Sequence, residues 1–298
     1  MAKPPQIGDP RKLADGLTCL LAPNPSPMTF WGTNTYLLGH DRLAVIDPGP
    51  DDPAHLAAVM DAIGGRPVSH ILVTHSHLDH SPLARPLARA TGAPVLAFGD
   101  SAAGRSTIMT DLARAGDLGG GEGIDHAFAP DVCLADGEVI TGKDWTLRAL
   151  HTPGHLGNHM CFLWNDRAFT GDLVMGWATS LVSPPDGDLT DFMASCTRLS
   201  DTGARQGYAG HGAPIPDLQG RIAALVTHRR QREAQILDQL AKGAQSARDI
   251  TKAIYTDVAA ALLPMAERNV LAHLIDLTSR QIAAPSGPLS GASKFTLK

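Results

Sequence analysis

The segment His75-Ser76-His77-Leu78-Asp79-His80 constrains this chain more than any other part of it, because it places three histidines and an aspartate within six residues. The whole chain has 13 histidines in 298 residues, so chance does not explain a cluster of this density. Imidazole nitrogens and carboxylate oxygens are common metal ligands in proteins. The segment therefore predicts a metal site, in preference to a polar strand end with solvated histidines.

The residues before this segment predict that it follows a buried strand. Residues 69–74 form a short run that is mostly apolar and β-branched. If extended backbone continues through His77, His75 and His77 lie on one face and can bind one ion together. Asp79 and His80 then fall in a turn before a predicted helix, so they point in another direction. This geometry predicts a second ion beside the first.

Three further candidate ligands lie downstream, each at the end of a short apolar segment and close to a glycine. They are His155, after the expected strand 145–150, Asp172, after 168–171, and His211, after 208–210. Each of them alone would more often be structural than a ligand. Together with the first cluster they predict one shared site of seven side chains.

In this order the seven residues resemble the metallo-β-lactamase superfamily. The resemblance implies an α/β fold, a four-layer αββα sandwich with two metal ions at one edge of its two sheets. It implies a first ion on His75, His77 and His155, a second ion on Asp79, His80 and His211, and Asp172 as a bridge between them. It also implies that Asp47, after the apolar run 43–46, supports the metal loop from behind without binding metal.

The expected chemistry follows from these ligand types. Two divalent ions about 3.5 to 4 Å apart lower the pKa of a shared water toward 7, which supplies a hydroxide without a side-chain base. The ligands suit Zn²⁺, the default expectation, and also Mn²⁺ or Fe²⁺. Asp79 is expected to bind metal and to orient the attacking water. His151 and His159 are candidates for donating a proton or a hydrogen bond, with a structural role as the equal alternative.

The C-terminal part of the chain predicts a second, helical unit. One amphipathic helix is expected from about residue 217 to the Lys242-Gly243 break, with the polar run 228–233 as a solvated or salt-bridged middle. Helices are also predicted from 246 to 255 and from about 263 to 280, followed by a turn or hairpin. We therefore divide the chain into a metallo-β-lactamase-like hydrolase domain, residues 1–241, and a winged-helix-like domain, residues 242–298.

Motifs in both regions are similar to those of the LACTB2-like branch of the superfamily. They are Thr33-Asn34-Thr35-Tyr36-Leu37, His228-Arg229-x-x-Arg232-Glu233 and Asn269-x-Leu271-x-His273-Leu274. The branch includes a single-strand endoribonuclease and thioester hydrolases that act on acyl carriers. The resemblance predicts a metal-dependent hydrolase of an ester, thioester or phosphodiester. Its alternatives are a single-strand endoribonuclease and a non-catalytic protein that binds metal or a ligand.

Charge favours a small-molecule ester or thioester as the partner, with single-stranded RNA as the alternative. The net charge is −5, and residues 244–298 carry six Lys or Arg against four Asp or Glu, a surplus of two. That surplus is too small for a strong phosphate-binding face, so we favour a packing role for the winged helix. Near the metals, residues 175–177 are expected to form an apolar wall that holds an acyl group, stacks a base or packs.

The remaining expectations concern the location of the protein, its oligomeric state and its cysteines. The chain shows no apolar stretch long enough for a signal peptide or a membrane span, so we expect a cytoplasmic protein without a membrane partner. Homo-oligomerisation is left open by the sequence. The four cysteines are far apart and lack Cys-x-x-Cys spacing, which predicts buried reduced thiols.

Overall fold

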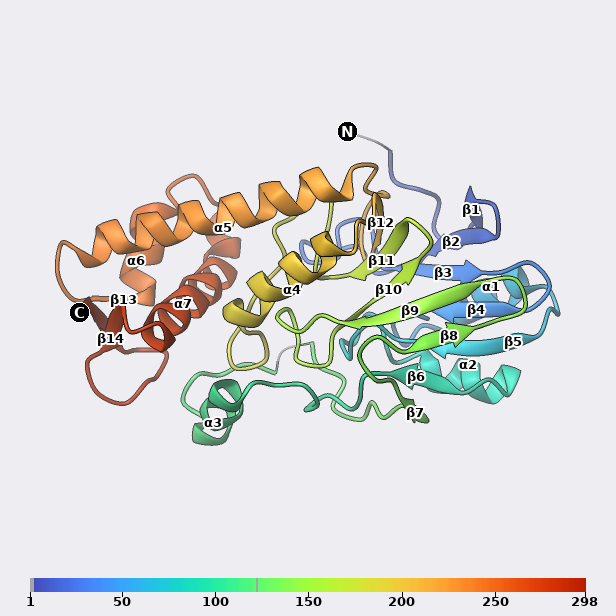
Figure 1. Cartoon of the computed structure of the whole chain (residues 1–298), viewed down its shortest axis with the longest axis horizontal. Helices are drawn as coiled ribbons and strands as arrows, with labels where there is room; N and C mark the ends of the chain where they lie inside the picture. Colours follow the sequence, from blue (N-terminus) through green and yellow to red (C-terminus); the bar gives the residue numbers. More distant parts are fainter. Residues whose placement is uncertain (1–2, 122) are drawn as a thin grey trace.

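Two β-sheets lie face to face in the computed structural model, which describes residues 3–121 and 123–298 (Figure 1). The first sheet contains, in spatial order, β1 (Arg11–Ala14), β2 (Leu17–Leu21), β3 (Asn34–Leu38), β4 (Leu43–Ile46), β5 (Val68–Leu72), β6 (Val95–Ala97) and β7 (Val132–Cys133). The second contains β12 (Gln206–Ala209), β11 (Arg167–Gly171), β10 (Met160–Trp164), β9 (Thr146–His151) and β8 (Val139–Thr141). Both sheets together form the middle two layers of the fold.

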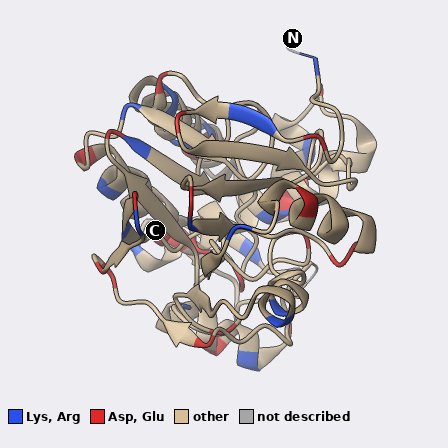
Figure 2. Cartoon of the chain, turned by 90° about the vertical axis from the view of Figure 1, so that its right-hand side faces the viewer, with Lys and Arg blue, Asp and Glu red and all other residues tan. Residues whose placement is uncertain are grey.

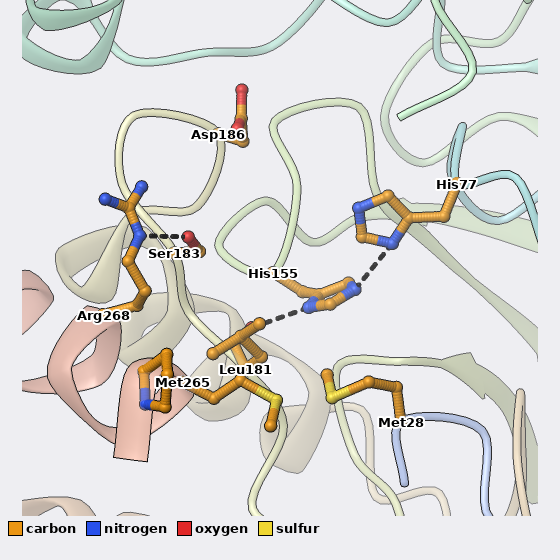
Figure 3. Close-up of a pocket in the computed structure, with 9 residues that line it drawn as sticks. Met28, His77, His155, Leu181, Ser183, Asp186, Met265 and Arg268 are labelled. Carbon is orange, nitrogen blue, oxygen red and sulfur yellow. Dashed lines mark hydrogen bonds between the residues drawn. The ribbon is translucent and has the colours of Figure 1, made fainter. Parts of the chain in front are cut away.

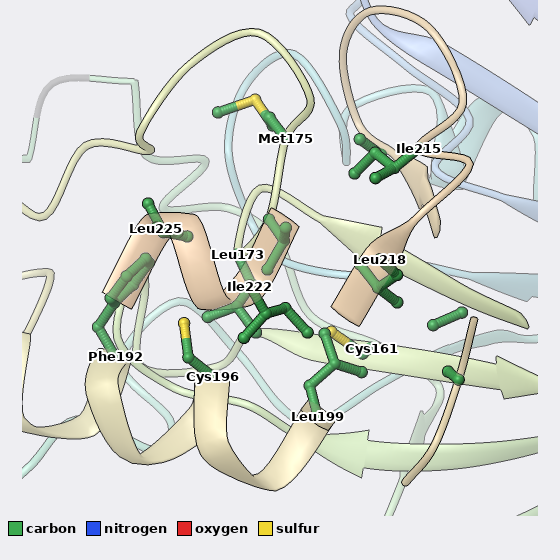
Figure 4. Close-up of a cluster of buried hydrophobic side chains, with 14 of the residues drawn as sticks. Cys161, Leu173, Met175, Phe192, Cys196, Leu199, Ile215, Leu218, Ile222 and Leu225 are labelled. Carbon is green, nitrogen blue, oxygen red and sulfur yellow. The ribbon is translucent and has the colours of Figure 1, made fainter. Parts of the chain in front are cut away.

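Side chains alternate between two buried faces along the central strands, as a period of two requires. In β3, Tyr36 and Leu38 face the second sheet, whereas Leu37 packs in a cluster with α1 (Pro53–Ile63) and α2 (Ala84–Thr91). In β10, Phe162 faces the first sheet, and Cys161 packs outward against α4 (Leu189–Asp201) and α5 (Leu218–Leu240) (Figure 4). The predicted four-layer αββα sandwich is therefore confirmed.

The strand directions bring the predicted metal residues to one edge of both sheets. Because β4 and β5 are parallel, Asp47 and His75, which follow them, lie at neighbouring strand ends. The parallel strands β11 and β12 likewise end beside each other, which places Asp172 near His211. His155 lies in the connection between the antiparallel strands β9 and β10. Segments that are far apart in the chain thus supply one cluster.

The C-terminal region has the predicted order of helix, helix and hairpin. It consists of β13 (Gln245–Ser246), α6 (Ala247–Ile254), a short 3₁₀ turn (Ala260–Leu262), α7 (Leu263–Ser279), β14 (Ala283–Pro285) and β15 (Lys294–Leu297). Asp217 caps α5 by accepting from the backbone N–H of Gly220. The start of α5 packs on the second sheet, and its end packs with α6, α7 and part of α3 (Thr107–Ala115). Because α5 contributes to both cores, the boundary at residues 241 and 242 stays a prediction.

Two sequence predictions about side-chain exposure were wrong. Arg229, in the middle of the polar run 228–233, is only 3% exposed, because it lies between α5 and α7 and donates to Asn269. Cys133 is exposed on β7, whereas the other three cysteines are free and buried as expected. Glu233 forms a salt bridge at 2.8 Å with Arg280, the residue that follows α7, which is one of the two alternatives for this run. The long helix is therefore partly a buried connection between the two units.

Charges of both signs are interspersed over the side of the molecule seen in Figure 2, which is the end that carries β1 to β5, α1 and α2 in Figure 1. In the two described ranges, no helix combines the length and the apolar character that crossing a bilayer requires.

His273 of α7 gives this region an expected pH dependence. Its ring is 2% exposed and neither nitrogen has a hydrogen-bond partner among the described residues. Burial, and then the charges of Arg229 and Arg280 with His228 and Arg232, lower the pKa of His273 to about 3. As the pH falls below about 6.5, His273 therefore becomes protonated in the unfolded chain but stays neutral in the folded chain.

We expect this difference to remove about 2 kcal/mol of folding stability between pH 7 and pH 5. Urea unfolding of the wild type and of His273→Leu at both pH values measures it, and the variant should lose less stability on acidification. The exposed His126 supplies the control, since His126→Gln should leave the wild-type slope unchanged. Equal slopes for His273→Leu and the wild type would contradict the assignment.

Candidate metal centre

The structure brings all seven predicted ligand residues together at the edge of the sandwich. Their ligand atoms form three overlapping groups in which every atom lies within 4.8 Å of the others. The groups are His75, His77 and His155; His75, His80 and Asp172; and Asp79, His80 and His211. The first and third groups match the two ligand sets that the resemblance implied.

Two of these histidines are oriented by backbone carbonyls. His155 donates its Nδ1–H to the carbonyl of Leu181 at 2.7 Å, and His211 donates its Nδ1–H to the carbonyl of Gly32 at 3.1 Å. A carbonyl only accepts, so each ring must carry its hydrogen on Nδ1. The Nε2 atoms of both rings are thereby left to face the cluster, which is the arrangement that metal-binding histidines require.

Asp47 orients two more histidines from behind the loop, as the resemblance implied. Its carboxylate accepts from the backbone N–H of Thr74 at 2.7 Å, from the Thr74 hydroxyl at 2.8 Å and from Nδ1 of His80 at 3.0 Å. Since the Thr74 hydroxyl donates to Asp47, it accepts the Nδ1–H of His75 at 2.9 Å. Asp47 itself has a φ of 50°, a left-handed conformation that few non-glycine residues adopt. One buried carboxylate therefore directs Nε2 of both His75 and His80 into the site.

The inward-facing nitrogens of the first group fit a cation. Nε2 of His75 lies 3.0 Å from Nδ1 of His77, which lies 3.1 Å from Nε2 of His155. His75 and His155 direct their Nδ1 hydrogens to Thr74 and Leu181, away from these three nitrogens. Burial, followed by the charge of His155, lowers the pKa of His77 to about 3, so its ring is neutral at neutral pH. Three imidazoles that converge in this way form a donor set for a divalent metal.

Two carboxylates complete the second group. Oδ2 of Asp79 lies 3.1 Å from Nε2 of His211 and 3.4 Å from Nε2 of His80. Oδ2 of Asp172 lies 3.3 Å from Nε2 of His211 and 3.7 Å from Nε2 of His155, so this carboxylate lies between the two groups. Its Oδ1 is buried and has no hydrogen-bond partner in the described part of the chain. A buried carboxylate oxygen of this kind needs a positive partner, which a bound ion supplies.

The carboxylates also set the charge of the second group. Burial alone would lower the pKa of His211, but the neighbouring Asp172 and Asp79 raise it to about 9. Burial would also lower the pKa of His80, but Asp79, Asp47 and Asp172 hold it well above its usual value. This part of the site therefore concentrates negative potential, which attracts cations.

The structure favours the structural alternative for both candidate proton donors. His159 accepts the backbone N–H of Asp172 on Nε2 at 3.1 Å and donates Nδ1–H to the Thr152 hydroxyl at 2.9 Å, so both its nitrogens are occupied. His151 donates from Nε2 to the carbonyl of Gly157 at 3.0 Å, and its ring stacks on Phe98 at 3.6 Å. Neither residue belongs to a metal-ligand group of the described chain. These contacts suit orientation of Asp172 by His159 and loop packing by His151, and a catalytic role for either residue stays a prediction.

Sequence reasoning missed the role of Gly210, although this glycine directly precedes His211. A Cβ atom on Gly210 would lie 2.4 Å from Oδ1 of Asp172 and 2.6 Å from Cε1 of His80. Only glycine, which has no Cβ, leaves room for both side chains in these positions. The available signal was a glycine beside a candidate ligand.

Comparison with known proteins agrees with this geometry. A family model described as the metallo-beta-lactamase superfamily matches residues 28–207, more than half of the chain. The chain belongs to this superfamily. A second model, the beta-lactamase associated winged helix domain, matches residues 246–287 of this metallo-β-lactamase superfamily protein. The chain is accordingly a member of a hydrolase superfamily with a His and Asp site suited to divalent metal ions.

Relatives of this superfamily member cover both of its regions. A beta-lactamase-like protein 2 homolog of Drosophila melanogaster is 31% identical over 89% of the chain and 89% of its own length. An atrochrysone carboxyl ACP thioesterase of Passalora fulva is 31% identical over 81% of the chain, which spans only 66% of that relative's length.

Solved structures extend the likeness to the whole fold. A metallo-beta-lactamase family protein of Thermus thermophilus has a TM-score of 0.76 at 26% identity, with 96% of this chain and 100% of that one covered. A beta-lactamase domain protein of Burkholderia ambifaria has a TM-score of 0.79 at 22% identity over 99% of this chain and 95% of that one, which shows the fold alone. Both matches extend over nearly the full length of the chain, winged-helix region included.

Proposed function

We propose that this protein hydrolyses acyl thioesters with two divalent ions, Zn²⁺ by preference. The proposed ligands are His75, His77 and His155 for one ion, Asp79, His80 and His211 for the other, and Asp172 for both. When bound, two such ions lower the pKa of a water toward neutrality and polarise a substrate carbonyl. The chain's own residues orient the ligands and shape the substrate pocket.

Asp79 is the proposed residue that orients the attacking water. Its side chain is 25% exposed, against 9% for Asp172, so it is the carboxylate that solvent reaches most easily. The hydroxyl of Thr33 accepts from Asn24 at 3.0 Å and therefore directs its hydrogen toward Oδ2 of Asp79, 3.4 Å away. This contact leaves the other carboxylate oxygen of Asp79 available to accept a hydrogen bond from water.

The single observation that carries the substrate proposal is an apolar pocket of about 410 Å³ beside His77 and His155 (Figure 3). Its apolar lining consists of Met28, Leu181, Pro264 and Met265. Pro264 and Met265 come from the first turn of α7, so the winged-helix region forms one wall of the pocket. Methionine side chains adapt their shape to an apolar guest. An acyl chain is the part of a thioester that fits such a wall.

The charged groups of this pocket are engaged by the protein itself. Asp186 pairs with Arg105 at 2.8 Å, and Arg268 donates to the hydroxyl of Ser183 at 2.8 Å and to the carbonyl of Pro184. A phosphodiester backbone is bound by Lys or Arg side chains whose N–H groups are still free to donate hydrogen bonds to it. The pocket therefore favours an uncharged acyl group over a nucleic-acid strand, and the name of the Passalora fulva relative points to the same bond type.

Single-stranded RNA is the second candidate, and one observation favours it. Phe30 stacks between Trp31 and Trp177, with ring centroids 4.8 and 4.7 Å apart, beside a second pocket of about 590 Å³. Stacked aromatic rings are a common platform for unpaired bases. Trp177 belongs to this aromatic stack and also lines a third pocket, which lies beside α5.

Hydrolysis of three coenzyme A thioesters, acetyl, hexanoyl and decanoyl, and of a labelled single-stranded RNA separates these functions. We expect metal-dependent thioester cleavage that chelator removes, and a kcat/KM for hexanoyl about tenfold or more above that for acetyl, because each buried methylene contributes about 0.8 kcal/mol. RNA cleavage without thioester cleavage would overturn the proposal in favour of the nuclease. Turnover of neither substrate, with metal bound, would favour a non-catalytic binding protein.

A further inference from the structure

The loop from residue 179 to residue 183 lies between a metal-site histidine and the winged-helix region. The carbonyl of Leu181 accepts the Nδ1–H of His155 at 2.7 Å, which is the contact that directs Nε2 of His155 into the cluster. The side chain of Leu181 lines the apolar pocket (Figure 3). The orientation of His155 therefore depends on where this one peptide group is held.

The same peptide group is held on its other side by α7. The backbone N–H of Val182 donates to Oδ1 of Asn269 at 3.2 Å. The Leu181 carbonyl and the Val182 N–H belong to one planar peptide unit and point in opposite directions. The peptide is thus clamped between Asn269 and His155, and a rotation that lost one hydrogen bond would also lose the other.

Arg229 of α5 fixes the clamp in place. It donates to Oδ1 of Asn269 at 2.8 Å and to the carbonyls of Thr179 and Ser180 at 2.8 and 2.6 Å. Its guanidinium also lies 5.2 Å from the ring of Phe192, and the side chain is 3% exposed. A buried arginine with these acceptors is costly to move, because each of its hydrogen bonds is charge-assisted.

We infer that Asn269 is a positioning residue for His155, so that the winged-helix region forms part of the metal centre as well as a wall of the pocket. A metal-binding histidine needs a fixed acceptor for its second nitrogen, and here that acceptor is held from a helix outside the αββα sandwich. The inference rests on the proposed function only in taking His155 as a metal ligand. It makes the two regions of the chain one functional unit.

Two substitutions at position 269 test the inference through metal affinity. Asn269→Leu keeps a similar volume but removes the acceptor for Val182 and Arg229. Asn269→Asp keeps an acceptor oxygen for both and adds a charge that suits Arg229. We expect Asn269→Leu to weaken binding of one Zn²⁺ about tenfold in competition with a chromophoric chelator. Asn269→Asp should bind as the wild type does.

A spectroscopic readout separates positioning from general loosening of the domain contact. The visible spectrum of the Co²⁺-loaded protein reports ligand geometry, so it should change in Asn269→Leu and not in Asn269→Asp. The matched control is Arg280→Gln, which breaks the bond between α7 and Glu233 of α5 without touching the loop. This control should leave both Zn²⁺ affinity and the Co²⁺ spectrum unchanged.

Several outcomes would overturn the inference. They are wild-type affinity in Asn269→Leu, an Asn269→Asp variant that is as weak as Asn269→Leu, or an equal loss in Arg280→Gln. If Asn269→Leu does not fold, Asn269→Ser, whose hydroxyl is too short to span both contacts, takes its place with the same expected result. A wild type that binds two ions but cleaves no thioester would refute the proposed function and leave this test valid, whereas a wild type that binds none would refute both.

Discussion

Replacing Asp172 with alanine should abolish hydrolysis and leave the protein unable to hold two divalent ions. The carboxylate of Asp172 lies 3.3 Å from Nε2 of His211 and 3.7 Å from Nε2 of both His155 and His80, so it faces both ligand groups. The alanine variant loses the carboxylate that is shared between the two ligand groups. Elemental analysis after dialysis should find at most one ion per chain, and thioester turnover should fall by several orders of magnitude.

A carboxylate outside the site provides the control for this experiment. Asp41 is exposed and pairs with Lys143 at 2.6 Å. It precedes β4 whereas Asp47 follows it, so Asp41→Ala removes an equal charge at the other end of this strand. It should retain two ions and full turnover. If Asp172→Ala also retained both, Asp172 would not be the bridging ligand and the assignment of the site would have to change.

Adding a single methyl group at Gly210 should also damage the site. The Cβ of alanine at this position would lie 2.4 Å from Oδ1 of Asp172 and 2.6 Å from Cε1 of His80, closer than such atoms approach in proteins. One of the two side chains must therefore shift. Because a displacement of about 1 Å in a catalytic site costs roughly 10²-fold in rate, we expect kcat/KM of Gly210→Ala to fall by about that factor.

The matched control is another glycine close to the same site. At Gly176 the nearest neighbour of an added Cβ is a side-chain carbon of Ile215 at 3.6 Å, which is an ordinary contact. Gly176→Ala should keep wild-type kcat/KM and wild-type Zn²⁺ affinity in the chelator competition. Wild-type values for Gly210→Ala would show that the Asp172 and His80 positions are not the ones that the reaction uses.

The sequence predicts well those features that depend on residues close together in the chain. The six-residue cluster at His75 contains four of the seven ligand residues, and the apolar, β-branched run before it identifies its strand. Helix ends are also local signals, because Asp217 and Ser246 cap α5 and α6 with their own side chains. The distant ligands His155 and His211 were found through the resemblance to the family and the glycines beside them.

The features that the sequence did not predict depend on contacts between distant residues. Arg229 lies in a run that is typical of a solvated helix face, and only its packing against α7 and the loop at residue 180 makes it buried. Asn269 was singled out in a branch motif, but its bond to Val182 joins positions that are 87 residues apart. His159 appeared as a candidate proton donor, because nothing near it in sequence reveals that Asp172 and Thr152 occupy both its nitrogens.

Crystals of the Zn²⁺-loaded protein, measured at the zinc absorption edge, test the central claim most directly. The account predicts two anomalous peaks about 3.5 to 4 Å apart. One peak should lie among His75, His77 and His155, the other among Asp79, His80 and His211, with Asp172 in contact with both. An anomalous map with no peak at this edge of the sandwich, or with zinc bound only elsewhere, would contradict it.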